Sequence, residues 1–424
     1  MPAHTRTAVV GGGWAGLAAA VEATRLGQSV TLFEMASRLG GRARSVDVAG
    51  LALDNGQHIL IGAYVETLAL MRRVGVDLEA ALLRSPLRLV DAHGVGLRLD
   101  AGAPSHAFMR AVLRQRGWRW RERLALLAAT ARWRLGRFRC PPSLTVAALT
   151  RGLPIAVRDD LIDPLCVAAL NTPSNEASAQ VFLRVLKDAL LSGPGSADLL
   201  LPRIDLGALL PGPAGTWLQQ AGARLRLAQR VGSITPDGAD WQLDGEPFDR
   251  VVLATPPREA ARLARDIAPD WARQAEALRY EPIVTVYLHG DQVRLPEPML
   301  ALRPDAASPA QFVFDRGQLG GPAGLLAFVI SGAQPWVDRG SEAIVEAVQR
   351  QASETLGAAL RGSLRRVQTV VEKRATFRCT PALERPAMRL ADGLHAAGDY
   401  VDGPYPATLE GAVRSGLGAA RSSN

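Results

Sequence analysis

The chain has 424 residues, of which 48% are hydrophobic and 21% charged, with a formal net charge of +8; this excludes a disordered or fibrous protein and allows two or three domains. Its three cysteines, Cys140, Cys166 and Cys379, lie far apart, which excludes a disulfide framework, predicts no metal site and suits a reducing compartment. No apolar run reaches the roughly 20 residues that a membrane-spanning helix needs.

The first predicted element is a strand over residues 7–10 that runs directly into a glycine-rich turn. Gly11, Gly13 and Gly16 follow the spacing GxGxxG, and an alanine-rich helix continues toward Gly27. A second strand over residues 29–33 ends at Glu34, 23 residues after Gly11. The order strand, glycine turn, helix, strand and acid is typical of a βαβ unit that holds an adenine dinucleotide.

Each residue of this unit has a physical role. Gly11 permits a sharp turn, Gly13 lets the backbone approach a pyrophosphate, and Gly16 lets the helix pack closely on the sheet. The helix N-terminus offers unpaired N–H groups to phosphates, and Glu34 can accept hydrogen bonds from ribose hydroxyls. The alternatives are a glycine turn without a ligand and a signal peptide. The complete βαβ context disfavours the first, and the triple glycine with a single upstream arginine disfavours the second.

Residues 64–225 are predicted to be mostly helical, with proline and glycine interruptions. Between Arg110 and Arg139 there are ten arginines and one acid, Glu122, and aromatic residues interleave with them at Trp118, Trp120, Trp133 and Phe138. This pattern predicts that segment 106–140 faces an anionic membrane. Nucleic acid is the competing partner for such a patch and is not the partner we favour. The third interpretation is a solvated surface in a protein that uses arginine for lysine, since the chain has only two lysines.

Short strands are predicted over residues 224–227, 231–234, 241–243 and 250–254, with turns at Pro236-Asp237-Gly238 and Asp244-Gly245. The last of these strands is continuously apolar from Val251 to Ala254, as expected inside a parallel sheet. Residues 283–288 alternate as a strand of another sheet, residues 341–360 have the periodicity of an amphipathic helix, and a small-residue helix is predicted from about residue 408 to 420.

These elements predict an α/β protein with two domains. A discontinuous Rossmann-like nucleotide-binding domain with a β-meander takes residues 1–63, 223–257 and 386–424. An α+β substrate domain takes residues 64–222 and 258–385, and it includes the helical segment 106–140.

Several motifs together resemble the flavin-dependent amine oxidase and carotenoid desaturase superfamily. They are the GxGxxG turn, Glu34, Gly40-Gly41-Arg42, the meander that ends at Ala254-Thr255-Pro256, Gly398-Asp399, and Glu410-Gly411-Ala412 with Ser415-Gly416. Within it the chain is most similar to the squalene-associated desaturase-like proteins, the hydroxysqualene dehydroxylases. That likeness is carried by residues 53–62, by Leu170-Asn171-Thr172-Pro173 and by residues 398–410.

The resemblance implies non-covalent FAD and a reductive dehydroxylation of hydroxysqualene to squalene in bacterial squalene and hopanoid synthesis. It implies cofactor contacts at Gly11, Gly13, Trp14, Ala15, Gly16, Glu34, Gly41, Arg42, Val231, Gly398, Asp399, Thr408 and Leu409. The glycines would surround the pyrophosphate, Val231 would pair with adenine through its backbone, and the amides at Thr408 and Leu409 would face the flavin. A helix N-terminus at that place would also stabilise an anionic reduced ring, on physical grounds alone.

The proposed reaction needs an acid for the leaving hydroxyl group and a dry site for hydride transfer. His58 is the first candidate acid because its ordinary pKa lies near neutral pH, and Asp54 and Tyr405 are the others. Each has a structural alternative: His58 could bond backbone in a buried loop, Asp54 could shape the turn with Asn55-Gly56, and Asn171 could cap a helix or line the pocket. Amine oxidases of the resembled superfamily usually place a lysine near the flavin N5. Neither Lys187 nor Lys373, the two lysines of the chain, stands in a sequence context that suits this role, so amine oxidation is disfavoured.

The expected substrate is a polyisoprenoid lipid, and the expected place is the cytoplasm or the inner surface of the inner membrane. Other squalene-pathway enzymes are expected partners. No second nucleotide fingerprint is present, so an external donor, NADPH or a separate reductase, would supply electrons. Two other functions remain open. One is a phytoene-type desaturase or oxidase, which uses the same fold in the opposite direction, and the other is a non-catalytic flavin-containing scaffold at a membrane.

Overall fold

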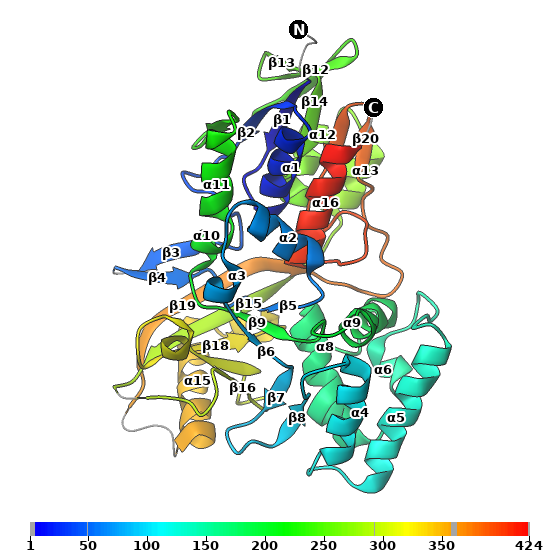
Figure 1. The fold of residues 1–424 in the computed structure, drawn as a ribbon, viewed down its shortest axis with the longest axis vertical. Coiled ribbons are helices and arrows are strands. Elements are labelled where there is room, and N and C mark those ends of the chain that lie inside the picture. Colours follow the sequence, from blue (N-terminus) through cyan, green and yellow to red (C-terminus); the bar gives the residue numbers. More distant parts are fainter. Residues whose placement is uncertain (1–4, 49, 292, 358–362, 423–424) are drawn as a thin grey trace.

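The computed structural model describes residues 5–48, 50–291, 293–357 and 363–422. Figure 1 shows a sheet layered with helices at the top, near both termini, a second sheet at lower left and a cluster of helices at lower right. Residues 40–63 and the strands β5 (Leu60–Ile61) and β9 (Leu199–Pro202) lie where these regions meet. The site described below is built at this junction.

The upper sheet has six strands in the order β10 (Arg224–Arg226), β2 (Ser29–Phe33), β1 (Arg6–Val10), β14 (Arg250–Leu253), β21 (Leu394–Ala396) and β20 (Arg389–Ala391). All neighbours pair in parallel except β20 with β21. The parallel sheet confirms the α/β class expected from the sequence. Because parallel strands end at one edge, the loops after β1, β2 and β14 gather there.

Helices cover both faces of this sheet. Side chains alternate along β1, so that Val9 packs with α1 (Trp14–Arg25), α2 (Val65–Arg73), α11 (Pro211–Gln220) and α16 (Leu409–Arg421). Its neighbours Ala8 and Val10 pack on the opposite face with α12 (Pro257–Ala264) and α13 (Pro269–Glu276). Both faces of the strands are therefore buried, which explains their continuous apolar sequence.

The predicted meander is present as an antiparallel sheet of β11 (Ile234–Asp237), β12 (Asp240–Leu243) and β13 (Glu246–Phe248). The strand predicted over residues 231–234 is wrong in its bounds. The backbone N–H groups of Gly232 and Ser233 donate to the Asp244 carboxylate instead of to a neighbouring strand. Val231 consequently lies in a loop, and the strand begins at Ile234.

The lower-left sheet is antiparallel, in the order β16 (Met299–Ala301), β17 (Phe312–Asp315), β18 (Leu325–Ile330), β15 (Tyr280–His289) and β19 (Arg365–Phe377). β15 confirms the strand predicted at residues 283–288. One face packs on α15 (Ser341–Leu356), with α14 (Gln334–Val337) beside it, and the other carries Tyr287 and Phe314 toward the centre of the molecule. The helix predicted over 341–360 ends at Leu356, and positions 358–360 lie outside the described residues.

Residues 64–225 are less helical than predicted. The helices, besides α2 and α11, are α3 (Leu78–Ala81), α4 (Pro104–Arg114), α5 (Trp120–Leu135), α6 (Val146–Leu149), α7 (Ile155–Val157), α8 (Asp163–Leu170), α9 (Ala179–Leu191) and α10 (Leu206–Leu209). Strands β6 (Leu82–Ser85), β7 (Arg88–Val90), β8 (Gly96–Arg98) and β9 interrupt them, and β9 pairs with β5 and β6 from distant parts of the chain. Two to four residues are too few for periodicity to reveal a strand.

A hairpin of β3 (Ser45–Val48) and β4 (Leu51–Asp54) precedes this region. In the described ranges, none of the helices combines the length and apolar character that crossing a bilayer requires.

The boundaries of the two predicted domains stay a prediction. Strands from residues 6–33, 224–253 and 389–396 nevertheless share the six-stranded sheet.

Glu22 on α1 joins three helices in the upper layer. Its carboxylate is inaccessible to solvent and accepts hydrogen bonds from Arg25, from Arg73 on α2 and from Arg421 on α16, at 2.7–3.1 Å. The hydrogen bond from Arg25, followed by that from Arg421, lowers the pKa of Glu22 from 4.5 to about 2, against the opposing effect of burial. A depressed carboxyl pKa means that the ionised form stabilises the fold.

We expect Glu22→Gln to lower the free energy of unfolding at pH 7 by about 2 kcal/mol, after allowing for solvent screening of the half-exposed arginines. This stabilisation is fully present above about pH 4.5 and is lost as the pH falls toward 2, so the difference between the two proteins should shrink over that range. Urea unfolding at several pH values measures it. Glu79→Gln, at an exposed site, is the control. A difference that is independent of pH would contradict this role of Glu22.

Candidate functional site

A continuous cavity of about 1020 Å³ lies at the junction of the three regions. One end is formed by residues that follow the strands of the parallel sheet, among them Gly11, Glu34 and Thr255. The other end is lined by apolar side chains of the helical region and the antiparallel sheet, such as Leu126, Val185 and Phe312. We call these the polar end and the apolar end. Their continuity means that a ligand at one end can meet a ligand at the other.

The glycine turn forms the floor of the polar end. Gly11 has φ +111°, and a Cβ there would lie 2.4 Å from the carbonyl oxygen of Ala254, so only glycine fits. Gly13 is the N-cap of the 12-residue helix α1 and has no side-chain cap. A Cβ on Gly13 would meet only the Cα of Gly41, at 3.8 Å. The start of α1 is therefore open to the cavity, where its N–H groups and dipole favour a phosphate.

Gly16 packs α1 on the sheet, as its spacing predicts, but it is not among the residues of the cavity wall, where the resemblance implied a cofactor contact. It does not line the cavity, because a Cβ on it would lie 1.8 Å from the carbonyl oxygen of Gly11 and 3.1 Å from the Cβ of Ala254. The absence of a side chain at Gly16 thus permits the close packing of α1 against the ends of β1 and β14. The other predicted cofactor-contact residues all line the cavity: Gly11, Gly13, Trp14, Ala15, Glu34, Gly41, Arg42, Val231, Gly398, Asp399, Thr408 and Leu409.

Glu34 stabilises the turn before any ligand is considered. Its carboxylate accepts the N–H of Gly12 at 2.6 Å and the N–H of Ala36 at 2.8 Å. A carboxylate has about four acceptor positions, so two remain for ligand hydroxyls. Val231 also lines this end, and its carbonyl oxygen accepts a hydrogen bond from Arg262 at 2.9 Å. Trp14 lies with its indole N–H donating to the Ala43 carbonyl, so its side chain fixes the loop after Gly41.

Two buried hydroxyl groups at the cavity lack a partner. Thr255, two residues after β14, and Tyr400, directly after Asp399, both line it, and neither hydroxyl makes a hydrogen bond within the described part of the chain. An unpaired buried hydroxyl group costs stability unless a ligand or water satisfies it. The polar end therefore fits a large polar ligand, and the glycine floor fits a phosphate-containing one.

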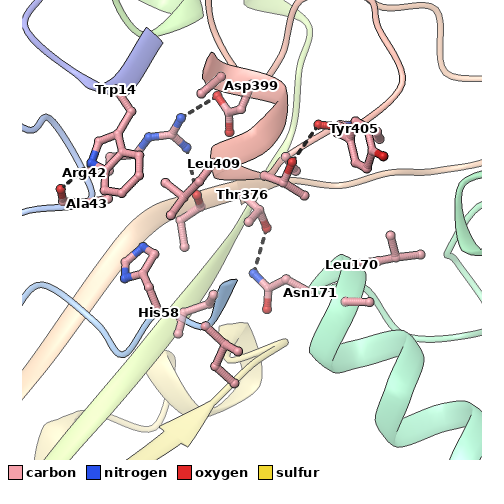
Figure 2. Close-up of a pocket in the computed structure, with 18 of the residues that line it drawn as sticks. Trp14, Arg42, Ala43, His58, Leu170, Asn171, Thr376, Asp399, Tyr405 and Leu409 are labelled. Carbon is pink, nitrogen blue, oxygen red and sulfur yellow. Dashed lines mark hydrogen bonds and ion pairs between the residues drawn. The ribbon is translucent and has the colours of Figure 1, made fainter. Parts of the chain in front are cut away.

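Arg42 and Asp399 connect chain segments that are far apart in the sequence. The guanidinium lies 2.5 Å from the Asp399 carboxylate and donates to the carbonyls of Arg374 and Ala375 on β19 (Figure 2). Asp399 follows β21, and the N–H of the preceding Gly398 donates to Ser415 on α16. This ion pair joins the loop after β2 to the C-terminal part of the chain.

The predicted C-terminal helix begins beside the cavity. α16 has Thr408 as its N-cap, whose hydroxyl accepts the N–H of Gly411 at 3.0 Å and donates to the carbonyl of Tyr405 at 2.9 Å. Thr408 and Leu409 line the cavity (Figure 2). A second helix N-terminus thus points a partial positive charge at the same space.

His58 is one of two candidate acids that the structure brings to the cavity. It is enclosed in the loop after β4, and its Nδ1 lies 2.9 Å from the carbonyl oxygen of Gly56 (Figure 2). A carbonyl only accepts, so Nδ1 carries the proton. Burial lowers the pKa of His58, which keeps the ring neutral at pH 7. Its Nε2 is then an acceptor, better suited to hold a hydroxyl group than to protonate one.

Tyr405 is the other candidate acid at the cavity. The guanidinium groups of Arg184 and Arg414 lie 5.6 Å and 4.9 Å from its ring centre, and the ring of Tyr64 packs edge-on at 6.3 Å. Burial, followed by the negative charge of Asp188, raises the pKa of Tyr405 to about 12. Its hydroxyl is therefore protonated at neutral pH and can donate, while the nearby guanidinium groups favour negative charge on the ring.

Asp54 does not belong to the cavity, so the expectation that it could act as the acid there is corrected. Its buried carboxylate accepts the N–H of Leu206 at 2.8 Å and lies 4.0 Å from Arg316. Burial raises the pKa of Asp54 to about 6, a value typical of a general acid, but the group lies away from the cavity wall. Its observed role is to anchor the hairpin β3–β4 to α10.

Asn171 fulfils both roles that the sequence left open, because it caps a helix and also lines the cavity. It ends α8 in the left-handed conformation, lines the cavity, and bonds the Glu281 carbonyl, the Thr376 hydroxyl and the Gly332 N–H (Figure 2).

Sequence reasoning missed Arg184 and Asp188 on α9, which pair at 2.7 Å and line the cavity. Their signal was an i,i+4 ion pair on a largely apolar helix. Neither Lys187 nor Lys373, the chain's two lysines, lines it.

Known proteins resemble this chain along nearly its whole length. The family model described as flavin containing amine oxidoreductase matches residues 14–422. The hydroxysqualene dehydroxylase of Rhodopseudomonas palustris is 30% identical, over 97% of this chain and 96% of that protein. That of Sinorhizobium fredii is 29% identical over the same shares. Among solved structures, cyclohexylamine oxidase from Brevibacterium oxydans superposes with a TM-score of 0.69 at 16% identity, over 99% of this chain and 98% of that one.

Proposed function

The chain belongs to the flavin containing amine oxidoreductase family, and we propose that it is an FAD-dependent enzyme that reduces hydroxysqualene to squalene. The family membership makes it a flavin-dependent oxidoreductase. The observation that carries the finer proposal is the continuous cavity, whose polar end holds the glycine turn and two helix N-termini and whose apolar end is lined mainly by hydrocarbon side chains. The two near-full-length relatives named hydroxysqualene dehydroxylase support the choice of substrate.

The residues of the polar end fit the parts of FAD. The start of α1 at Gly13 would take the pyrophosphate, and Glu34 would take the ribose hydroxyls with its remaining acceptor positions. The backbone of Val231 would face adenine, and the start of α16 at Thr408 and Leu409 would face the flavin ring. Thr255 and Tyr400 supply hydroxyl groups that still need partners.

The chemistry that a reduced flavin supplies when bound is a hydride, which takes the place of the hydroxyl group on carbon while that group leaves with a proton as water. We propose that Tyr405 supplies this proton through its O–H, and that His58 accepts a hydrogen bond at Nε2 to orient the departing group. Aromatic walls such as Phe312 and Phe314 would tolerate an allylic cation better than aliphatic ones. The apolar lining excludes water from it.

Amine oxidation is the activity that this site favours least. The chain offers no lysine at the described cavity wall, and the carboxylate that α9 contributes, Asp188, is already paired with Arg184. A protonated amine substrate would need an unpaired carboxylate there. The external electron donor, NADPH or a reductase, remains part of the proposal and has no dedicated fingerprint in the sequence.

The test is a single turnover without oxygen. The purified holoprotein is reduced by light or dithionite and mixed with hydroxysqualene, and lipid is analysed by mass spectrometry while flavin absorbance is followed. We expect one squalene formed for each flavin reoxidised. Reoxidation without squalene would overturn the proposal. Dehydrogenation of a polyene such as phytoene by the oxidised protein would favour the desaturase alternative, and lipid binding with no turnover in either direction would favour the scaffold.

A further inference from the structure

Helix α5 (Trp120–Leu135) is apolar on two opposite faces. Leu126, Ala129 and Trp133 form the buried face. Trp120, Leu124 and Leu135 are 59%, 46% and 86% exposed, and Ala128 and Ala131 between them are exposed as well. These five positions follow the spacing i, i+4, i+8, i+11 and i+15, so they form one stripe along the whole helix, opposite the buried face. We call it the α5 stripe.

A row of large exposed apolar side chains costs solubility and commonly marks a contact surface. The arginines beside the α5 stripe indicate what it contacts. Arg121 and Arg132 flank it on one side and Arg134 on the other, while Arg137 and Arg139 follow the end of the helix, all exposed. Within the described chain none of these five has an ion pair, and Glu122 is the only acid between Arg110 and Arg139. The surface therefore has an apolar centre and an unneutralised cationic rim.

The inner face of the same helix lines the apolar end of the cavity. Leu126, Thr130 and Trp133 of α5, together with Phe138 after it and Phe108 of α4, contribute to that wall. Figure 1 places α5 at the outer edge of the helical cluster, on the opposite end of the molecule from the two termini. One helix thus separates the cavity from the exterior and presents apolar side chains to both.

We propose that α5 lies in the surface of an anionic lipid bilayer, with the α5 stripe inserted among the acyl chains and the flanking arginines at the lipid phosphates. A surface helix that exposes Trp and Leu along one face, with Arg beside them, can bind in this mode. Charge complementarity selects a bilayer over a second copy of the chain, because two arginine rims would repel each other. The apolar centre selects it over nucleic acid, whose phosphates give exposed leucines nothing to bury against.

The test is sedimentation of the holoprotein with vesicles of phosphatidylcholine, with or without about one third phosphatidylglycerol. We expect binding to the anionic vesicles, weakened by salt, at least 10-fold tighter than to the neutral ones. Trp120→Gln with Leu124→Gln and Leu135→Gln should reduce binding at least 10-fold. Arg132→Gln with Arg134→Gln and Arg137→Gln should reduce it roughly 100-fold on anionic vesicles only.

The matched control is Leu26→Gln with Leu227→Gln, which removes apolar side chains of 45% and 41% exposure at the upper end of the molecule. It should bind as the original protein does. Lipids with brominated acyl chains should quench part of the tryptophan fluorescence of the bound protein, and this quenched part should be missing in the Trp120→Phe variant. Binding that ignores the α5 stripe, equal binding to neutral vesicles, tighter binding to duplex DNA, or a dimer that the stripe variant dissolves would each overturn the proposal. Because vesicle binding requires no turnover, its failure is separate from failure of the proposed reaction.

Discussion

Gly13→Ala is expected to leave the fold intact and to weaken FAD binding about 100-fold, through loss of the close phosphate contact at the start of α1. The new Cβ would meet only the Cα of Gly41, at an ordinary contact distance of 3.8 Å, and Gly13 has φ −75°, which alanine adopts readily. The methyl group would therefore cost the protein little by itself. It would occupy the space in front of the N–H groups where a pyrophosphate has to lie.

FAD titration of the apoprotein measures the affinity, and circular dichroism on heating measures the fold. Gly152→Ala is the control, since a Cβ there meets nothing within 4 Å. Gly16→Ala should behave in the opposite way. Its Cβ would overlap the Gly11 carbonyl, so it should destabilise the protein itself by several kcal/mol. Unchanged FAD affinity in Gly13→Ala would show that the phosphates do not bind at α1.

Tyr405→Phe is expected to lower the rate of single-turnover squalene formation about 100-fold, which is the lower end of what a positioned proton donor contributes. The ring would stay between Arg184 and Arg414, so only the hydroxyl group changes. FAD binding should be retained. Tyr287→Phe is the control, because that buried hydroxyl donates to the carbonyl of Asp54 and lies outside the cavity wall. It should cost about 1 kcal/mol of stability without a large effect on the rate.

The pH dependence separates the two candidate acids. Since burial raises the pKa of Tyr405 to about 12, its hydroxyl stays protonated, and the rate should be flat between about pH 6 and pH 9. If His58 were the acid, the reactive form would be the imidazolium. Its pKa is lowered, so the rate would rise steadily as the pH falls through that range. A full rate in Tyr405→Phe, or a profile that rises toward acid pH, would transfer the role to His58.

Both predictions depend on the convergence of chain segments that the sequence keeps apart. The turn at Gly13, the loop at Arg42 and the start of α16 line one cavity because the strands that precede them end at the same edge of the parallel sheet or beside it. The Arg42–Asp399 ion pair joins residues separated by 357 positions. A ligand bound there would hold the N- and C-terminal parts of the chain together, so FAD should also protect the protein against unfolding.

Local sequence patterns predicted several of the helices, strands and turns correctly. The GxGxxG turn, the helix after it and Glu34 define their own backbone geometry, since glycine spacing, helix propensity and a buried apolar strand act over a few neighbouring residues. The same holds for β15, for most of α15 and for the helix that starts after Thr408. Gly11, Gly13 and Glu34, which these local signals identified, line the polar end of the cavity, whereas Arg42, Val231 and Asp399 were expected there only from the family resemblance.

Only the tertiary structure decided which groups face the cavity. Asp54 and His58 belong to one short segment. The Asp54 carboxylate accepts a hydrogen bond from the N–H of Leu206 on α10, whereas the His58 side chain lines the cavity wall. Arg184 and Asp188 reach the cavity because α9 packs beside Tyr405. The short strands β6 and β9 form because β9 pairs with β5 and β6, which are distant from it in the sequence. The sequence determined local conformation through near neighbours. Burial, pKa and access depend on contacts between distant residues, which no spacing along the chain encodes.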